Sequence, residues 1–264
     1  MSRTGYFAKR VAGLVVSVWA VFTLAFLYVE FTPYNESLVQ GAGLPTSPDA
    51  PATERYIDWL VWFVTIPGGS VIDPLLESLK YTLAYLLPAL VLAIVVGTGL
   101  RVYTVSLERS RLDDAVDAVT VVAVSVPVFL LAFALRDPFL NNYFDRLGYL
   151  RIYHPGKGPL SVRNLLAAVW PMTVMTIYLV AIQLRYAGEE LRQYVSADFV
   201  KTARAKGAST WGVGRHVFRN TAVPLLTLFF TDMFGMVVVG VFVVEFVTTA
   251  PGVGELMTTA VLED

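Results

Sequence analysis

Few residues in this chain of 264 amino acids are of the types that usually carry chemistry. Cysteine is absent, which excludes disulfides, thiolate metal sites and cysteine nucleophiles. The two histidines, His154 and His216, lie on either side of a long apolar run, so they should not share a metal or catalytic site. Residues 156–158 read Gly-Lys-Gly but lack the earlier glycine and the following hydroxyl of a phosphate-binding loop. We therefore predict no catalytic residue, no cofactor, no metal site and no enzymatic activity in this chain.

Two carboxylates in the last part of the chain have unusually apolar surroundings. Asp232 interrupts the apolar run Thr221–Val244, and Glu245 follows that run directly. A carboxylate at the centre of a membrane helix costs roughly 2.5–3.5 kcal/mol to insert, so Asp232 should face a pore, a neighbouring subunit or a buried partner. It either lines a translocation path or forms a hydrogen bond that fixes helix packing. Glu245 lies nearer to solvent and is a candidate for an external gate.

An Asp232→Asn variant separates the two roles of that residue. If Asp232 lines the path, reconstituted transport of a cationic or polar substrate should lose rate or affinity, because the amide carries no charge. Transport at the wild-type rate and affinity would contradict the pore-lining role.

The elements that must hold these residues are membrane helices. The chain is 56% hydrophobic and 16% charged, whereas soluble domains carry about 25% charged residues. A helix needs about 20 apolar residues to cross the hydrocarbon core, and continuous runs of this length are typical of helices rather than of β-barrel strands. We therefore predict an all-α polytopic protein, one transmembrane domain of residues 1–264 with about five spans. These are Val11–Val29, Tyr81–Leu100, Ala118–Leu135, Leu165–Leu184 and Thr221–Val244.

Basic residues are distributed unevenly among the loops. With the N-terminus in the cytoplasm, 13 Lys and Arg residues lie inside and 7 lie outside, in line with the preference of basic loops for the cytoplasm. We predict a multi-pass protein of the cell membrane, with an external loop at 32–75 and a cytoplasmic loop at 185–219. The net charge of −1 gives no basic field for nucleic acid, so the expected partner is the lipid membrane.

The cytoplasmic loop 185–219 is patterned like a pair of helices. Leu191, Val195 and Phe199 recur every four residues, as in an amphipathic helix that lies along the membrane or a partner. A helical run from Asp198 should end at Gly207, because glycine is a frequent C-terminal cap.

Either Ser209 or Thr210 could then cap the start of the next helix. A short helix, a glycine break and another helix would form a compact knob. On composition alone, the same loop could be a basic connector held near anionic headgroups.

The order of residues in this loop resembles the signature cytoplasmic loop of ABC importer permeases. Residues 198–209 read Asp-Phe-Val-Lys-Thr-Ala-Arg-Ala-Lys-Gly-Ala-Ser, and residues 215–224 read Arg-His-Val-Phe-Arg-Asn-Thr-Ala-Val-Pro. Both strings are similar to the oligopeptide/dipeptide branch, in which an arginine stands where this chain has Lys201. Weaker similarities lie in the first span, in 125–129 (Ser-Val-Pro-Val-Phe) and in 245–254 (Glu-Phe-Val-Thr-Thr-Ala-Pro-Gly-Val-Gly). The resemblance therefore covers nearly the whole chain.

One feature departs from that branch. Its members usually carry a sixth span beyond the segment that matches 245–254, whereas this sequence ends at Asp264. The last helix could be missing from this sequence, be supplied otherwise, or be absent from a five-span variant.

The resemblance implies the ABC importer permease fold and a transport function. The chain would pair with a second, homologous permease subunit around a pore, and an external solute-binding protein would deliver peptides. Two cytoplasmic ABC ATPase subunits would dock on the knob; their closure on ATP would open the pore outward, and hydrolysis would return it inward. The residues implied in the ATPase contact are Asp198, Lys201, Thr202, Ala203, Arg204, Ala205, Lys206 and Gly207.

Other functions remain open at this point. Within the same family the substrate could be nickel or another small solute instead of a peptide. Related permeases transport peptides or metal complexes, and no residue of this chain distinguishes the two substrate classes. A standalone secondary transporter or channel would work without nucleotide, with Asp232 binding its coupling ion, but would leave the knob unexplained. A membrane anchor or sensor would show no flux at all.

Overall fold

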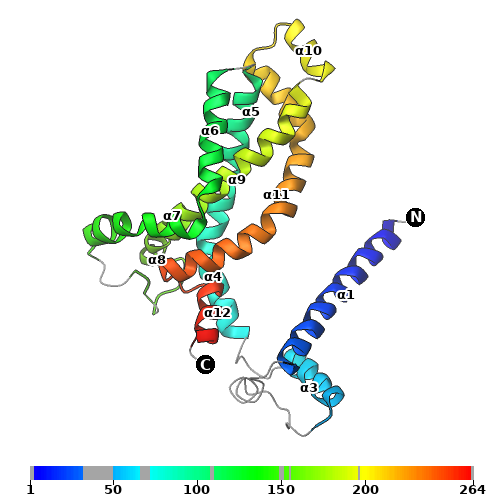
Figure 1. The fold of residues 1–264 in the computed structure, drawn as a ribbon, viewed down its shortest axis with the longest axis vertical. Coiled ribbons are helices and arrows are strands. Elements are labelled where there is room, and N and C mark those ends of the chain that lie inside the picture. Colours follow the sequence, from blue (N-terminus) through cyan, green and yellow to red (C-terminus); the bar gives the residue numbers. More distant parts are fainter. Residues whose placement is uncertain are drawn as a thin grey trace. The chain divides into compact units, whose positions relative to one another are not determined.

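The computed structural model describes residues 3–31, 50–65, 72–107, 110–148, 152–154, 156–195 and 197–262. Every regular element in these ranges is helical, as the sequence predicts (Figure 1). In chain order the elements are α1 (Arg3–Glu30), α3 (Ala52–Thr65), α4 (Ile72–Leu92), the π-helical η1 (Ala93–Thr98), α5 (Gly99–Ser106), α6 (Arg111–Ser125), α7 (Val128–Ala134), the π-helical η2 (Pro138–Phe144), α8 (Val162–Ala167), α9 (Val169–Val195), α10 (Asp198–Ala205), α11 (Thr210–Thr248) and α12 (Val253–Leu262).

The described residues form two compact units, and the smaller one contains α1 and α3. Within it, the Phe26 ring of α1 packs against Tyr56 and Trp59 of α3, with centroid distances of 5.1 and 5.9 Å. Glu30 and Arg55 form an ion pair between the same two helices. The predicted external loop 32–75 therefore contains a helix that packs on the first predicted span; its residues 32–49 and 66–71 lie outside the described ranges.

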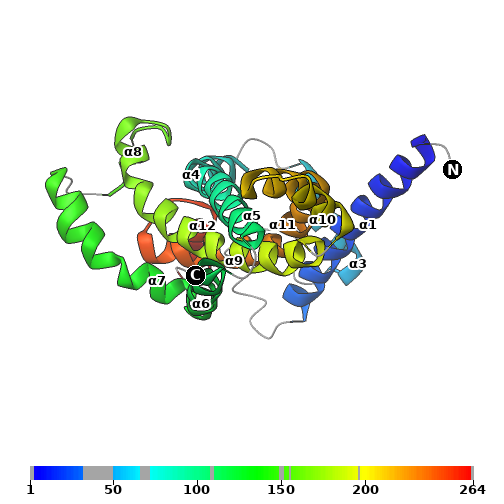
Figure 2. The ribbon, with the colours of Figure 1, turned by 90° about the horizontal axis from the view of Figure 1, so that it is seen from above.

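The larger unit, Pro74–Ala260, is built around α9. This helix has buried residues along most of its length and packs against η1, α5, α6, α7 and α11. Trp170, Met175 and Leu179 of α9 form one core with Tyr85 of α4 and Val244 of α11. A second apolar cluster, which includes Val102 of α5, Leu191 of α9 and Val213 of α11, lies nearer the α10 end. Figure 2 shows α9 passing between α5 and α6 on its way from α8 toward that end.

The third predicted span, Ala118–Leu135, is not one straight helix. It is divided between α6 and α7, which are bent by 92° relative to each other. Pro127 causes the break, because proline has no N–H to donate and pushes the preceding Val126 into extended backbone, with φ −82° and ψ 115°. In Figures 1 and 2 the chain beyond the bend, α7 and η2, projects from the side of the unit.

The number of spans differs from the predicted five. In the described part of the chain, Gly5–Tyr28 and Asp73–Ser106 are long and apolar enough to cross a membrane alone. The number rises to four if two bent pairs each count as one span: α6 with α7, and Val237–Thr248 with Val253–Thr259, which are bent by 70°. The predicted span Leu165–Leu184 is not among them. It lies mostly in α9, which carries polar residues such as Gln183 and is largely covered by its neighbours rather than facing lipid.

Candidate functional site

The predicted helix–glycine–helix knob is confirmed in its local structure. α10 ends at Ala205, and Gly207 follows with φ +78°, a left-handed conformation that glycine adopts without strain. The Ala208 N–H donates to the Ala203 carbonyl at 3.0 Å, which closes the end of the helix. α11 then begins at Thr210, and Ser209 caps it by accepting from the Gly212 N–H at 3.2 Å.

α10 has one buried face and one exposed face. Val200 is fully buried in the second apolar cluster, where it packs with Leu191 of α9 and with Val213 and Val217 of α11. The opposite face is open, so α10 can present it to another protein while remaining attached to α9 and α11. The residues of the predicted ATPase contact that are exposed are Asp198, Lys201, Thr202, Ala205, Lys206 and Gly207.

Two predicted contact residues, Ala203 and Arg204, are half-buried. The Arg204 guanidinium donates to the Ser106 carbonyl of α5 at 3.4 Å, so this residue also links α10 to α5.

The prediction of one amphipathic helix through Leu191, Val195 and Phe199 is wrong. α9 continues to Val195, and the chain turns before α10 begins at Asp198. Leu191 is fully buried, whereas Phe199 is 37% exposed. The turn brings Val200, rather than Phe199, against Leu191 in the same apolar cluster.

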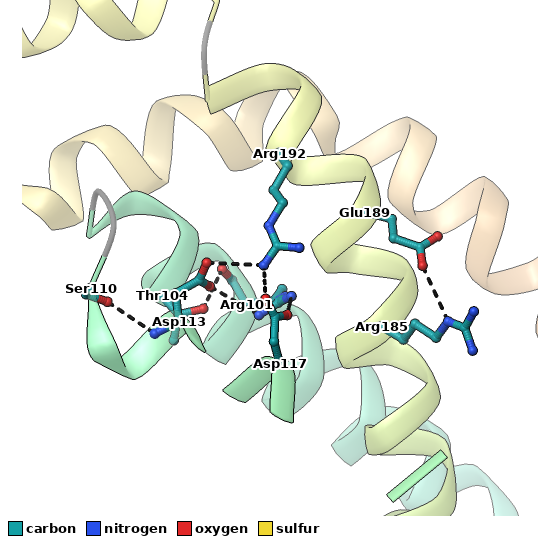
Figure 3. Close-up of polar contacts among 8 residues, drawn as sticks. All are labelled: Arg101, Thr104, Ser110, Asp113, Asp117, Arg185, Glu189 and Arg192. Carbon is teal, nitrogen blue, oxygen red and sulfur yellow. Dashed lines mark hydrogen bonds and ion pairs between the residues drawn. The ribbon is translucent and has the colours of Figure 1, made fainter. Parts of the chain in front are cut away.

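Four charged side chains meet beside this knob, and sequence reasoning missed them (Figure 3). Arg101 of α5 pairs with Asp113 at 3.1 Å and with Asp117, both of which lie on α6. Arg192 of α9 pairs with Asp113 at 3.2 Å and with Asp117 as well. Asp113 and Asp117 are one helical turn apart, an arrangement that is unfavourable unless cations lie nearby. This spacing of two aspartates is the feature of the sequence that indicates nearby cations.

Gly188 makes room for this charge cluster. A Cβ atom at position 188 would lie 2.1 Å from Nε of Arg101, so only glycine lets the buried guanidinium pass beside α9. Arg101 is only 2% exposed, which means that its charge depends on Asp113 and Asp117 rather than on water.

Glu245 is fully buried, so the expectation that it lies nearer to solvent is wrong, whereas its role in an external gate stays a prediction. One carboxylate oxygen accepts from the hydroxyls of Thr82 at 2.6 Å and Tyr85 at 2.7 Å, both on α4. The other accepts from the N–H groups of Gly254 at 2.6 Å and Glu255 at 3.4 Å in the first turn of α12. These donors replace water around the carboxylate, and a helix N-terminus favours negative charge.

The Glu245 site holds α4, α11 and α12 together at the end of the larger unit opposite α10 (Figure 1). Gly252 is required there, because a Cβ atom at that position would lie 2.1 Å from Oε1 of Glu245. Asp232, the other candidate of the pore or gate, lies on α11, but its side chain is outside the described part of the structure.

Comparison with known proteins identifies the family of this chain. Residues 89–263 match the family model described as "Binding-protein-dependent transport system inner membrane component". A putative peptide transport system permease protein of Brucella abortus is 28% identical, in an alignment that covers 98% of this chain and 87% of that protein. The dipeptide transport system permease protein of Bacillus subtilis is 23% identical over 97% of this chain and 85% of its own length.

A glutathione transport system permease protein of Escherichia coli is 26% identical, in an alignment that covers 97% of this chain and 86% of that protein. The matched family region contains the α10 knob, the four-charge cluster and Glu245 with its partners in α12, whereas Thr82 and Tyr85 precede that region. The chain therefore belongs to the family of inner membrane components of binding-protein-dependent transport systems.

Proposed function

We propose that this chain is the membrane-spanning permease subunit of an ATP-driven importer of peptides, and that α10 is the helix on which an ATPase subunit docks. The observation that carries the proposal is the two-sided character of α10. Its buried residue Val200 attaches it to α9 and α11, while its other face is open to a partner. A helix that is fixed on one side and exposed on the other can pass a push from a soluble subunit to the membrane helices.

The attachment of α10 to three membrane helices supports this mechanical role. Val200 packs with Val102 and Val105 of α5 in the apolar cluster, and Arg204 donates to the Ser106 carbonyl of the same helix. Close-packed clusters transmit displacement because they are not easily compressed. In this mechanism closure of the ATPases displaces α10, the attached helices tilt, and the pore opens outward; ATP hydrolysis returns it inward.

The partners and the orientation follow from the same proposal. The chain pairs with a second, homologous permease subunit, two ATPases lie in the cytoplasm on the α10 side, and an external binding protein delivers substrate on the Glu245 side. The N-terminus then lies in the cytoplasm. Asp232 stays a candidate for the translocation path.

The peptide substrate is supported by the relatives, whose names specify peptide, dipeptide and glutathione transport. The charge balance of the chain, with 20 basic and 21 acidic residues, favours neither a strongly anionic nor a strongly cationic solute. Selection of the solute would rest largely with the binding protein.

Reversing the exposed charges of α10 tests the docking. Lys201 and Lys206 are exposed. Among the described residues, Lys201 pairs only with Asp198 of its own helix turn, at 3.0 Å, so replacement of the two lysines should leave the fold intact. We expect the double variant Lys201→Glu, Lys206→Glu, purified from native membranes in mild detergent, to lose its ATP-binding subunits. Mass spectrometry would identify those subunits by their phosphate-binding loop.

The double variant Lys80→Glu, Lys157→Glu is the matched control, because both lysines are exposed and belong to the segments at the end opposite α10. It should retain the ATPases and the second permease chain. Recovery of a homo-oligomer without any ATPase from the wild-type chain would overturn the proposed function and favour a transporter that works without nucleotide.

A further inference from the structure

The four-charge cluster of Arg101, Asp113, Asp117 and Arg192 joins three helices and balances its own charge. Each arginine pairs with both aspartates, so two positive and two negative charges share one site (Figure 3). Arg101 is the buried member of the cluster, and Arg192 lies at its exposed edge, with 46% of its side chain exposed. Breaking one member of such a cluster leaves the remaining charges incompletely neutralised in a partly dry site.

The cluster matters most for α6, which is mostly exposed, although its half-buried Val124 packs on the apolar core. All residues of α6 are described, and Thr120 is its only buried one. Val119, Val121 and Val122 are each about two-thirds exposed, so they contribute little to packing within the chain. The ion pairs of the two aspartates are therefore the main polar interactions between α6 and its neighbours α5 and α9.

The same helices carry the contacts of α10. Ser106, which accepts from Arg204 of α10, is five residues beyond Arg101 on α5. Leu191, which packs on Val200 of α10, directly precedes Arg192 on α9. Two of the three helices that α10 contacts, α5 and α9, are thus the two that the charge cluster joins to α6.

We propose that this cluster is a positioning element that fixes α6 to α5 and α9, so that a displacement of α10 carries α6, and α7 beyond it, along with the other helices. This inference rests on the proposed function of α10. Without the cluster, the ATPases would still displace α10, but α6 would not move with it. Fewer substrate molecules would then be transported per ATP hydrolysed.

Arg192 and Arg185 offer a matched comparison on one helix. Both are exposed arginines of α9. Within the described ranges Arg185 pairs only with Glu189 of the same helix, at 3.4 Å, whereas Arg192 bridges to α6 (Figure 3). In vesicles containing the full complex, we expect Arg192→Gln to lower the number of substrate molecules transported per ATP hydrolysed about fivefold. Arg185→Gln should leave this ratio at the wild-type value.

Arg192→Lys should restore part of the ratio, because an ammonium keeps the charge but lies on a shorter, more flexible side chain than the planar guanidinium, one nitrogen of which reaches both carboxylates. A purely structural role would change the yield of the complex without changing transport per ATP. If the intact Arg192→Gln complex couples as well as the wild type, the proposal is wrong.

A distance measurement tests the fixation itself and does not require transport. The chain has no cysteine, so Ala115→Cys on α6 and Gln193→Cys on α9 would be the only labelling sites for a spin-label pair. We expect a narrow distance distribution in the wild-type background and a broad one with Arg192→Gln, while Arg185→Gln stays narrow.

A narrow distribution with Arg192→Gln would overturn the fixation of α6, whatever the outcome of the ATPase experiments. Failure of the wild-type chain to bind ATPases would contradict the proposed function instead. The two failures can therefore be told apart.

Discussion

Replacement of Gly207 by valine should uncouple ATP hydrolysis from transport. Gly207 adopts φ +78°, which a β-branched residue reaches only with strain of about 1–3 kcal/mol. Nothing lies within 4 Å of the position that a Cβ atom would take there, so the penalty comes from the backbone and not from a steric clash. The chain should relieve it by abandoning the turn, which breaks the hydrogen bond from the Ala208 N–H to the Ala203 carbonyl.

Transport per ATP should then fall about tenfold, because a strain of about 1.4 kcal/mol shifts the population of the correct turn by that factor. Reconstituted vesicles, with ATP hydrolysis and substrate uptake measured together, give this ratio directly. Gly207→Asn is the control at the same position, since asparagine tolerates the left-handed conformation better than other residues do. We expect the order Gly, Asn, Ala, Val from best to worst. A valine variant that transports normally would contradict the role of the turn.

The structure of the knob could be predicted because its signals are local. The end of α10 depends on one glycine, and the start of α11 depends on Ser209, a residue two positions later. Capping of this kind is decided within a single turn of chain, so the sequence order alone reports it. Which face of α10 is buried was not visible in the same way, because Val200 meets partners on three other helices.

The charge cluster could not be predicted because its members are far apart in sequence. Arg192 lies 75 positions from Asp117 along the chain, and the two meet only through the packing of α6 on α9. The paired aspartates on α6 indicated that cations must be near, but not which ones. The bend between α6 and α7 had a clearer signal in Pro127, although hydropathy alone made this segment one continuous span.

Glu245 shows the limit of judging a carboxylate by its place in an apolar run. Its position after the run indicated access to water. The groups that surround it instead come from elsewhere in the chain: Thr82 is 163 positions earlier, and the backbone N–H donors belong to a helix that begins eight positions later. The short helix α12, which is bent by 70° relative to the end of α11, provides the N–H groups that water would otherwise supply.

Replacement of Glu245 by leucine should strongly destabilise the chain. Leucine removes the acceptor of two hydroxyls and two backbone N–H groups, and each buried donor left without a partner costs about 1–3 kcal/mol. Thr82 retains the Ser78 carbonyl as a second acceptor, at 3.3 Å, so the loss falls mainly on Tyr85 and the first turn of α12. We expect the midpoint of thermal unfolding, measured on the purified chain in detergent, to fall by roughly 5–10 °C.

Gly252→Ala should act in the same direction through a different atom, because its Cβ would occupy the space of the Glu245 carboxylate. Gly99→Ala is the matched control. Nothing lies within 4 Å of a Cβ atom at position 99 of α5, so alanine should leave the midpoint unchanged or raise it slightly. A Gly252→Ala chain that unfolds at the wild-type temperature would contradict this expectation, because it would show that the turn before α12 can shift enough to accommodate the methyl group.

Glutamine at position 245 decides between a structural carboxylate and a gate. Backbone N–H groups can only donate, but the Thr82 and Tyr85 hydroxyls can also accept, so an amide can turn its oxygen to Gly254 and its NH₂ to the hydroxyls. Glu245→Gln should therefore keep most of the stability that leucine loses. If Glu245 were instead a solvated gate, both variants would unfold like the wild type and differ only in transport. A stability order of Glu, Gln, Leu would place its main role in joining α4 to the corner between α11 and α12.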